Sequence, residues 1–203
     1  MSSKVKLDRP SIGPWTITTE RIVIAGVLAA ITIILGIVPG LGFIPIPNMS
    51  GNATTEHIPT ILGGIIAGPI VGIFSGLVFG LISFTRATLP LFKDPTVAIL
   101  PRLFIGLVSW AVFAGLVRFN RDAAAAVAGF AGSATNSVLV VTMAVVRGYI
   151  PPRLIVILAI VPQAVVEAVV AAILTVILVR VFYIIQGRYV RAPETKSREE
   201  LPY

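Results

Sequence analysis

Four polar side chains interrupt stretches of the sequence that are otherwise apolar, and they are the residues best suited to bind a solute. Glu167 and Gln163 are four residues apart, so a helix would place them on one face. Asn136 lies in an Ala-Thr-Asn-Ser run, and Arg102 follows a proline. A carboxylate, two amides and a guanidinium can hold a polar molecule by hydrogen bonds and ion pairs. Such groups are costly in a bilayer and usually face a cavity or a partner.

Each of these side chains also has a purely structural explanation. Glu167 could neutralise Arg102 or another arginine inside a bundle. Asn136 could join two helices by a hydrogen bond, which is the commoner role of a lone asparagine within a membrane. The clustering favours binding, because together these residues predict one polar patch towards the outer half of the bundle.

The composition explains why these residues stand out. The chain has 203 residues, of which 56% are hydrophobic and only 12% are charged, and its mean hydropathy is +0.97. Soluble domains carry about 25% charged residues. These values predict a protein embedded in a lipid bilayer, and they argue against a soluble enzyme or a nucleic-acid binder.

The sequence lacks the common motifs of catalysis. It contains no P-loop, no His-Glu-x-x-His and no Gly-x-Ser-x-Gly. It has no cysteine, and His57, its only histidine, would be a poor metal site by itself. We therefore expect no catalytic residues, no metal, no cofactor and no enzymatic activity.

Long uncharged runs predict an all-α bundle of membrane helices. Breaks are expected at Pro39-Gly40, at Gly68-Pro69 and at Pro162, which would divide the last run into a short segment and a final helix. Residues 42–59, with three prolines, two glycines and two asparagines, predict a long irregular loop. The apolar runs cover residues 22–38, 58–85, 97–116, 123–146 and 154–185.

Basic residues set the expected topology. They gather before the first apolar run and after the last, which predicts that both termini are cytoplasmic. Equal sides require an even number of crossings, so we predict six transmembrane helices. The predicted parts are a cytoplasmic N-terminal arm (1–19), a six-helix substrate-binding domain (20–186) and a cytoplasmic polar tail (187–203). The basic residues left outside, against the rule, are Arg86, Lys93, Arg147 and Arg153.

Glycines recur at every fourth position in the second apolar run, at Gly64, Gly68, Gly72, Gly76 and Gly80. This spacing puts them on one helical face, where another backbone can approach closely. We expect this face to pack inside the bundle.

Several short motifs, taken in order, resemble the substrate-binding S components of energy-coupling factor (ECF) vitamin transporters. The similarity covers residues 20–182, nearly the whole membrane part. The motifs are EHIP at 56–59, IIAGP at 65–69, GLVFGL at 76–81, LPRLFIG at 100–106, ATNS at 134–137 and VEAVVA at 166–171.

The resemblance implies a six-helix bundle without an ATPase of its own, located in the plasma membrane of a prokaryote. Such proteins bind a vitamin from outside and topple in the membrane against a T subunit driven by two ATPases. In this family the first helix presents Ala-x-x-x-Ala to the T subunit, and Ala25 and Ala29 match that pattern. Small residues at this spacing also serve ordinary helix packing.

The family likeness further implies that the first outer loop and the loop after the third helix cover the ligand. The order of motifs is most similar to the pantothenate-type branch, and folate- and cobalamin-type members share much of it. Arg86 and Arg102 suit a carboxylate-bearing vitamin. The expected substrate contacts are Asn52, Thr54, His57, Arg86, Arg102, Asn136, Gln163 and Glu167.

One other reading of the residues stays open. A small secondary transporter or channel for an anionic solute, working without partners, would also need a polar patch in an apolar bundle. Uptake into vesicles with no ATPase present would distinguish the two.

Overall fold

The computed structural model describes residues 13–38, 40–45 and 52–187 as a helical bundle with one short hairpin. Most of the predicted N-terminal arm and nearly all of the predicted tail lie outside these residues. The elements in chain order are α1 (Thr19–Ile37), β1 (Phe43–Pro45), β2 (Asn52–Thr54), α2 (His57–Leu62), the π-helical turn η1 (Gly63–Ala67), α3 (Pro69–Thr85), the 3₁₀ turn η2 (Pro90–Lys93), α4 (Pro95–Ala98), α5 (Leu100–Leu116), α6 (Arg121–Val146) and α7 (Leu154–Ile185).

Helices begin where the sequence supplies caps. The Thr18 hydroxyl accepts the backbone N–H of Arg21 at the start of α1, and the Asn120 side chain accepts that of Ala123 at the start of α6. Asp94 caps α4 and is followed by a proline at the first helical position. These side chains satisfy N–H groups that have no partner within the helix.

The predicted break at Gly68-Pro69 is present. Gly68 has φ +99°, a left-handed conformation that favours glycine, and Pro69 opens α3. The predicted division at Pro162 is wrong, because α7 runs without interruption from Leu154 to Ile185. Proline removes one backbone hydrogen bond, and the long apolar runs on both sides continue the helix past it.

Part of the loop predicted as irregular forms an antiparallel hairpin. Phe43 pairs with Thr54, and Pro45 pairs with Asn52. The strands are three residues long, and the proline stands at the end of one of them, where a missing N–H donor is tolerated. Strands this short leave almost no alternating pattern in the sequence.

Within the described residues, four helices are long and apolar enough to cross a membrane. They are Thr19–Ile37, Pro95–Leu116, Arg121–Val146 and Leu154–Ile185, and two shorter apolar helices cover His57–Ala67 and Pro69–Thr85. Large apolar side chains of α1 and α7 are exposed along much of each helix, as expected of surfaces that face lipid.

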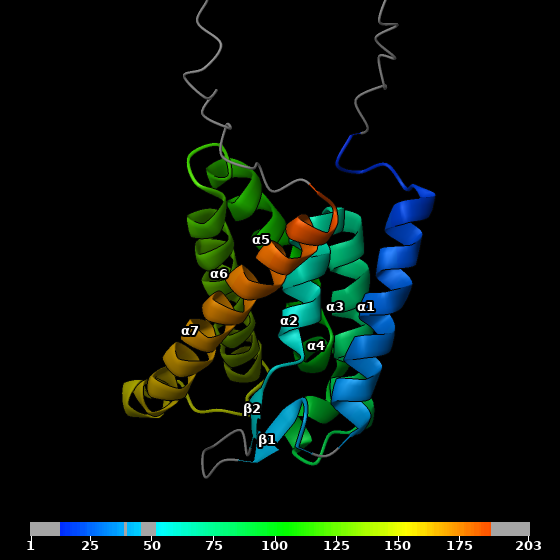
Figure 1. Cartoon of the computed structure of the whole chain (residues 1–203). Helices are drawn as coiled ribbons and strands as arrows, with labels where there is room; N and C mark the ends of the chain where they lie inside the picture. Colours follow the sequence, from blue (N-terminus) through cyan, green and yellow to red (C-terminus); the bar gives the residue numbers. More distant parts are fainter. Residues whose placement is uncertain (1–12, 39, 46–51, 188–203) are drawn as a thin grey trace, which may run out of the picture.

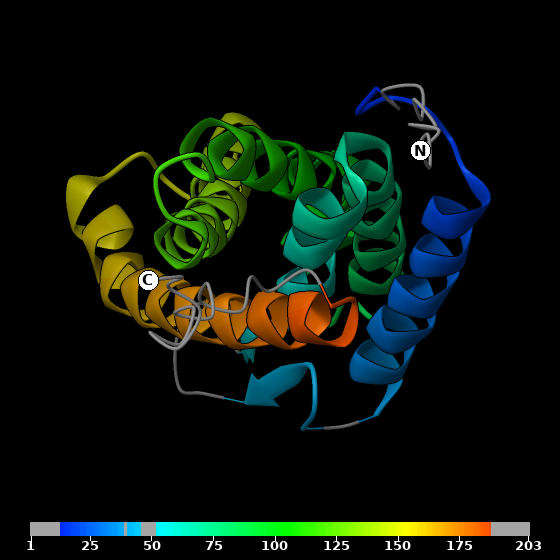
Figure 2. The same cartoon turned by 45° about the horizontal axis from the view of Figure 1, so that its top comes forward.

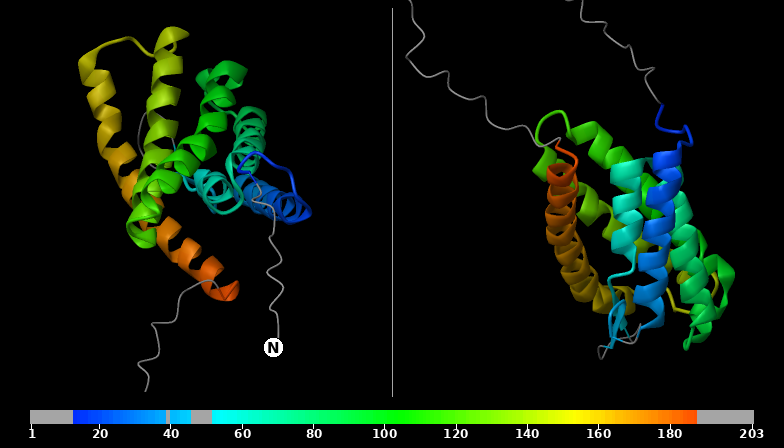
Figure 3. Two further views of the ribbon diagram at one scale, coloured as in Figure 1. Left: turned by 90° about the horizontal axis from the view of Figure 1, so that it is seen from above. Right: turned by 45° about the vertical axis from the view of Figure 1, so that its right-hand side comes forward.

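Helices α1, α3, α5, α6 and α7 pack around α2, which is buried and contacts each of them. α5 packs against α3 and α6, α6 packs against α7, and α1 packs against α3. α1 begins and α7 ends at one end of the bundle, and the β1–β2 hairpin lies at the other (Figure 1). Figure 2 shows α1 and α6 on opposite sides of the bundle, and α7 crosses it obliquely in Figures 1 and 3.

Glycines bring α3 into backbone contact with α5. A Cβ atom on Gly72 would lie 2.9 Å from the Cα atom of Gly106, and one on Gly64 would meet the Gly106 carbonyl. A Cβ on Gly76 would meet the carbonyl of Arg102. We call Gly64, Gly72, Gly76 and Gly106 the glycine seam. The predicted close packing is confirmed at Gly64, Gly72, Gly76 and Gly80. The five glycines do not share one helical face, because Gly64 belongs to η1 and Gly68 stands at the break before α3.

Candidate functional site

A cavity of about 540 Å³ lies at the hairpin end of the bundle. Its lining comes from the end of α1, from β2, from α3, α5, α6 and α7, and from the connections after α3 and α6. Six of the eight predicted contact residues line it: Thr54, Arg86, Arg102, Asn136, Gln163 and Glu167. Residues 113 positions apart in sequence therefore meet at one polar site.

Arg102 is a buried cation in the wall of the cavity. Its side chain is buried, with 3% exposure. The guanidinium donates to the carbonyl of Val97 at 2.6 Å and to the Ser83 hydroxyl at 3.4 Å. It stacks over the rings of Phe79 and Phe92, each 5.2 Å from the guanidinium carbon. Two aromatic rings and two neutral acceptors hold the cation in place while leaving its charge without a bonded carboxylate among the described residues.

Arg86 contributes a second cation at the edge of the cavity. It follows the last residue of α3, and its guanidinium donates to the carbonyl of Ile37 at 2.8 Å. That carbonyl belongs to the final turn of α1, where a positive charge complements the helix dipole. The contact places the Arg86 side chain between two helix ends that border the cavity.

Glu167 faces the cavity from α7 and is bonded to the hairpin. One carboxylate oxygen accepts the backbone N–H of Thr54 at 3.1 Å and the amide of Gln163 at 2.8 Å. The predicted helical spacing of Gln163 and Glu167 is thus realised as a direct hydrogen bond. The alternative that Glu167 neutralises Arg102 has no support among the described contacts.

Asn136 is the polar residue that α6 presents to the cavity. It is buried, with 6% exposure, and its side-chain oxygen has no hydrogen-bond partner among the described residues. An acceptor in this state is expected to bond a donor that enters the cavity, because an unsatisfied buried group is costly. Ser137, the next residue, also lines the cavity.

His57 and Asn52 are not among the residues that line the cavity. His57 is the first residue of α2 and is buried, with 1% exposure, and neither ring nitrogen has a partner among the described residues. Asn52 belongs to β2, and its side chain lies outside the described part of the structure. Thr54 also contacts the turn before α2, where its hydroxyl accepts the backbone N–H of Glu56.

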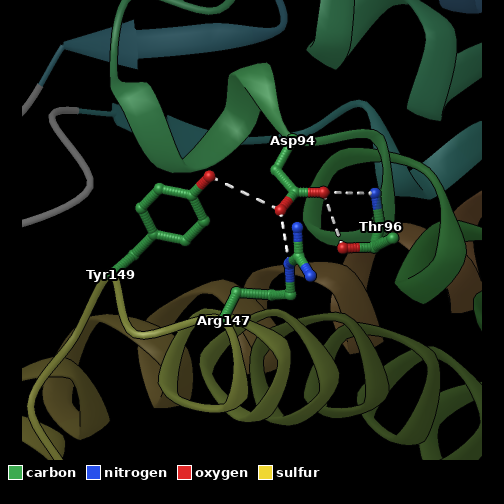
Figure 4. Close-up of polar contacts among 4 residues, drawn as sticks. All are labelled: Asp94, Thr96, Arg147 and Tyr149. Carbon is green, nitrogen blue, oxygen red and sulfur yellow. Dashed lines mark hydrogen bonds and ion pairs between the residues drawn. The ribbon is translucent and has the colours of Figure 1, made fainter.

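An ion pair joins the two connections that form another part of the rim (Figure 4). Asp94 accepts the Arg147 Nε–H at 2.6 Å and the Tyr149 hydroxyl at 3.4 Å. Its other oxygen accepts the hydroxyl and the backbone N–H of Thr96. The bonds from Thr96 and Arg147 lower the pKa of the Asp94 carboxyl to about 2, and the carboxylate raises the pKa of Arg147.

The sequence identifies Arg147 as a basic residue on the outer side, against the positive-inside rule, but it does not reveal the partner of this residue. Asp94 followed by Pro95 is a helix N-cap signal, which would have located the residue but not the contact across 53 positions. Other missed lining residues, such as Phe92, Tyr149 and Ile150, have no distinguishing pattern because they lie in connections.

The predicted docking residues lie on α1, away from this cavity. Ala25 is partly buried against the core and borders a second, almost wholly apolar groove of about 350 Å³ between α1 and α3. Ala29 is half-buried. Because alanine has a small side chain, another helix could approach α1 closely at both positions.

Chemically, the cavity is suited to binding rather than to bond-making. Two guanidinium groups lie on its α3–α5 side, and amide and carboxylate oxygens lie on its α6–α7 side. Among the described residues, no three His, Cys, Asp or Glu side chains gather as a metal site would require. A small molecule with a negative charge at one end and donors at the other would satisfy both sides.

Comparison with known sequences gives two matches. Residues 20–179 match the family model described as ECF transporter, substrate-specific component. The pantothenic acid transporter PanT of Lactococcus lactis subsp. cremoris (strain MG1363) is 36% identical over 111 residues. That segment covers 44% of this chain and 54% of the relative, so the match spans about half the length of that protein.

The fold is similar to that of a solved S component of a bacterial ECF transporter. The superposition has a TM-score of 0.61 and covers 83% of this chain and 98% of the other, at 19% sequence identity. At this identity the likeness concerns the arrangement of helices.

Proposed function

The chain belongs to the family of ECF transporter substrate-specific components, and on this premise we propose that it captures pantothenate from outside the cell. It is a component of a transporter and not an enzyme. The cavity at the hairpin end is the proposed binding site. Its volume of about 540 Å³ falls within the range of about 300–1,000 Å³ that is usual for small-molecule sites.

The observation that carries the choice of solute is the separation of charge across the cavity. Pantothenate has a carboxylate at one end and hydroxyl and amide groups along the rest of the molecule. Arg102 and Arg86 would receive the carboxylate. Asn136, Glu167 and Gln163 would receive the hydroxyl and amide groups. The similarity to the pantothenic acid transporter of L. lactis supports the same solute.

We infer a topology of six crossings with both chain ends in the cytoplasm. The four long apolar helices and the two shorter ones would supply the crossings, within residues 20–186. This places the hairpin end, and with it the cavity, on the outer side of a prokaryotic plasma membrane. The arm (1–19) and the tail (187–203) would then carry their basic residues inside.

Transport would require other chains. A T subunit in the membrane and two ATPases would supply the energy, and the loaded protein would topple against the T subunit. Ala25 and Ala29 are the proposed docking residues. The apolar groove beside Ala25 supports a helix-to-helix contact at this place, because small residues permit close approach.

Calorimetric titration with pantothenate tests the solute. Asn136→Ala is expected to weaken binding about 2–10-fold, the effect of losing one neutral hydrogen bond. Ser133→Ala is the matched control, because Ser133 is buried one turn earlier on α6 and does not line the cavity. Absence of binding in the unchanged protein, or equal losses in both variants, would contradict the proposed site.

The charge assignment has its own test. Pantothenol, in which an alcohol replaces the carboxylate, is expected to bind more weakly than pantothenate. In Arg86→Gln, pantothenate should lose affinity and pantothenol should change little. Equal losses for the two ligands would place the carboxylate elsewhere.

Uptake by reconstituted vesicles tests the docking residues. Ala25→Trp should abolish ATP-driven uptake and leave pantothenate binding unchanged, because the bulky ring would keep the T subunit at a distance. Val27→Trp is the control, since Val27 is already large and exposed on α1. Normal uptake by Ala25→Trp would remove the docking claim, and uptake without ATPases would favour a transporter working alone.

A further inference from the structure

A buried carboxyl group beside the cavity has no part in the site described above. Glu56 stands between β2 and α2, and its side chain is 0% exposed. Neither of its oxygens has a hydrogen-bond partner among the described residues. An ionised carboxylate without bonded partners is expensive to bury, so this group needs a proton or a counter-charge.

The position of Glu56 couples it to whatever occupies the cavity. A Cβ atom on Gly36 would touch one oxygen of Glu56, and Gly36 itself lines the cavity. That oxygen therefore lies beside a glycine of the cavity wall. A Cβ on Gly42 would lie 2.9 Å from the Glu56 side chain, so glycines make the space for the carboxyl on two sides.

The charged and titratable groups around Glu56 come from four elements. Arg102 on α5 and Arg86 at the end of α3 act on it electrostatically. His57 follows it at the start of α2, and Gly36 of α1 lies beside its carboxyl group. From α7, Glu167 lies beyond Thr54, whose hydroxyl accepts the Glu56 N–H. Arg102 and Arg86 both line the cavity and both act on Glu56, and the effect of Arg102 is the larger.

We propose that Glu56 is a proton-binding site, and that an anionic solute bound at Arg102 strengthens its hold on the proton. In the empty protein the positive charge of Arg102 partly compensates an ionised Glu56. When the carboxylate of the solute pairs with Arg102, that compensation is lost. At a pH where Glu56 is ionised in the empty protein, a proton from solvent then binds a Glu56 oxygen, so the anion and the proton enter together and no net charge is added.

The direction of the pH dependence follows from the state of the empty protein. Burial raises the pKa of Glu56, which lies outside the helices, to about 8. Below this value the proton is already present and anion binding is at its full strength. At a pH above this pKa, Glu56 is ionised in the empty protein and must take up a proton when the solute binds. The affinity for the solute should therefore fall by up to about tenfold per pH unit.

Infrared titration of the ligand-free protein tests the proton site without any solute. A protonated carboxyl band is expected near neutral pH, lost as the pH is raised above about 8 and missing in Glu56→Gln. Glu167→Gln is the matched control, because it removes the other carboxyl beside the cavity and should keep this band. If no band disappears in Glu56→Gln, the proposal is overturned.

Calorimetry with pantothenate tests the coupling, and this arm rests on the proposed function. In the unchanged protein near pH 8, heats measured in Tris and in phosphate should differ by the buffers' proton-release heats, reporting proton uptake. Glu56→Gln should bind with the same affinity at neutral and alkaline pH. Binding with equal heats in both buffers would overturn the coupling alone. If pantothenate gives no heat at any pH, the proposed solute is wrong, and the infrared titration still decides the proton site.

Discussion

The glycine seam and the rim of the cavity hold the molecule together in opposite ways. In the seam, the backbones of α3 and α5 touch, and a Cβ on Gly72 would lie 2.9 Å from Gly106. At the rim, segments that are distant in sequence meet through single polar contacts. Glu167 bonds the hairpin, and Asp94 bonds Arg147 after α6.

This difference implies that the α3–α5 wall of the cavity is rigid, whereas the parts held by polar contacts at the rim can move. Close packing has no alternative arrangement nearby, because every displacement opens a void or makes a clash. A polar contact at a half-exposed rim can be exchanged for a contact with water or with a ligand at little net cost. The α3–α5 wall, which carries Arg102, therefore keeps its shape, and the hairpin is the part of the cavity best able to open.

The largest effect is expected from a side chain placed in the seam. Gly106→Leu should prevent folding or strongly lower the melting temperature in detergent, since overpacking usually costs about 1–3 kcal/mol and here the clash is with backbone. Gly115→Leu is the control in the same helix, because nothing lies within 4 Å of a Cβ there. If both variants melt like the unchanged protein, the seam is not close-packed.

The next largest effect should come from the hairpin. Glu167→Ala removes the acceptor for the Thr54 N–H, a charge-assisted bond worth about 1.5–3 kcal/mol. Hydrogen exchange of the Thr54 amide should then be about 10–100-fold faster. Glu167→Gln keeps an acceptor oxygen and should change the rate far less.

Amides in the middle of α5 provide the internal reference for this measurement. They belong to the fixed wall and should exchange at the same rate in all three proteins. Unchanged exchange at Thr54 in Glu167→Ala would show that the hairpin is held by other contacts.

The seam could be predicted from sequence and the rim could not, for a physical reason. Glycines at every fourth position define one face of a helix, so Gly72 and Gly76 reveal a close contact whatever the partner. The contact of Asp94 with Arg147 spans 53 positions, and nothing local to either residue encodes the other. Arg147 can be recognised from the sequence as a basic residue that opposes the positive-inside rule. Its bond to Asp94, however, depends on where the end of α6 lies relative to the connection between α3 and α5.

The sequence predicts the part of the cavity lined by polar residues within apolar helices, but it does not predict the part lined by loops. Asn136, Gln163 and Glu167 stand out because lipid-facing positions exclude them. Tyr149 lines the cavity from a connection, where an aromatic or polar residue is unremarkable. The role of Glu56 could not be read from the EHIP motif either, because its burial arises from glycines on α1 and before the hairpin.

The smallest effect is expected at the ion pair of the rim, and its sign follows from the Asp94 carboxyl. Its pKa is lowered from 3.8 to about 2, so the bond to Arg147 is complete at neutral pH and persists to about pH 4. It is lost only as the pH falls towards 2.

Asp94→Asn should increase hydrogen exchange in residues 90–95 at most a few-fold at neutral pH, because Arg147 is half exposed. Lys93→Gln removes a neighbouring charge without touching the pair and should leave exchange unchanged. If Asp94→Asn increased hydrogen exchange in this segment as strongly as Glu167→Ala increases it in the hairpin, both parts of the rim would be equally able to open. The claim that the hairpin is the part best able to open would then be wrong.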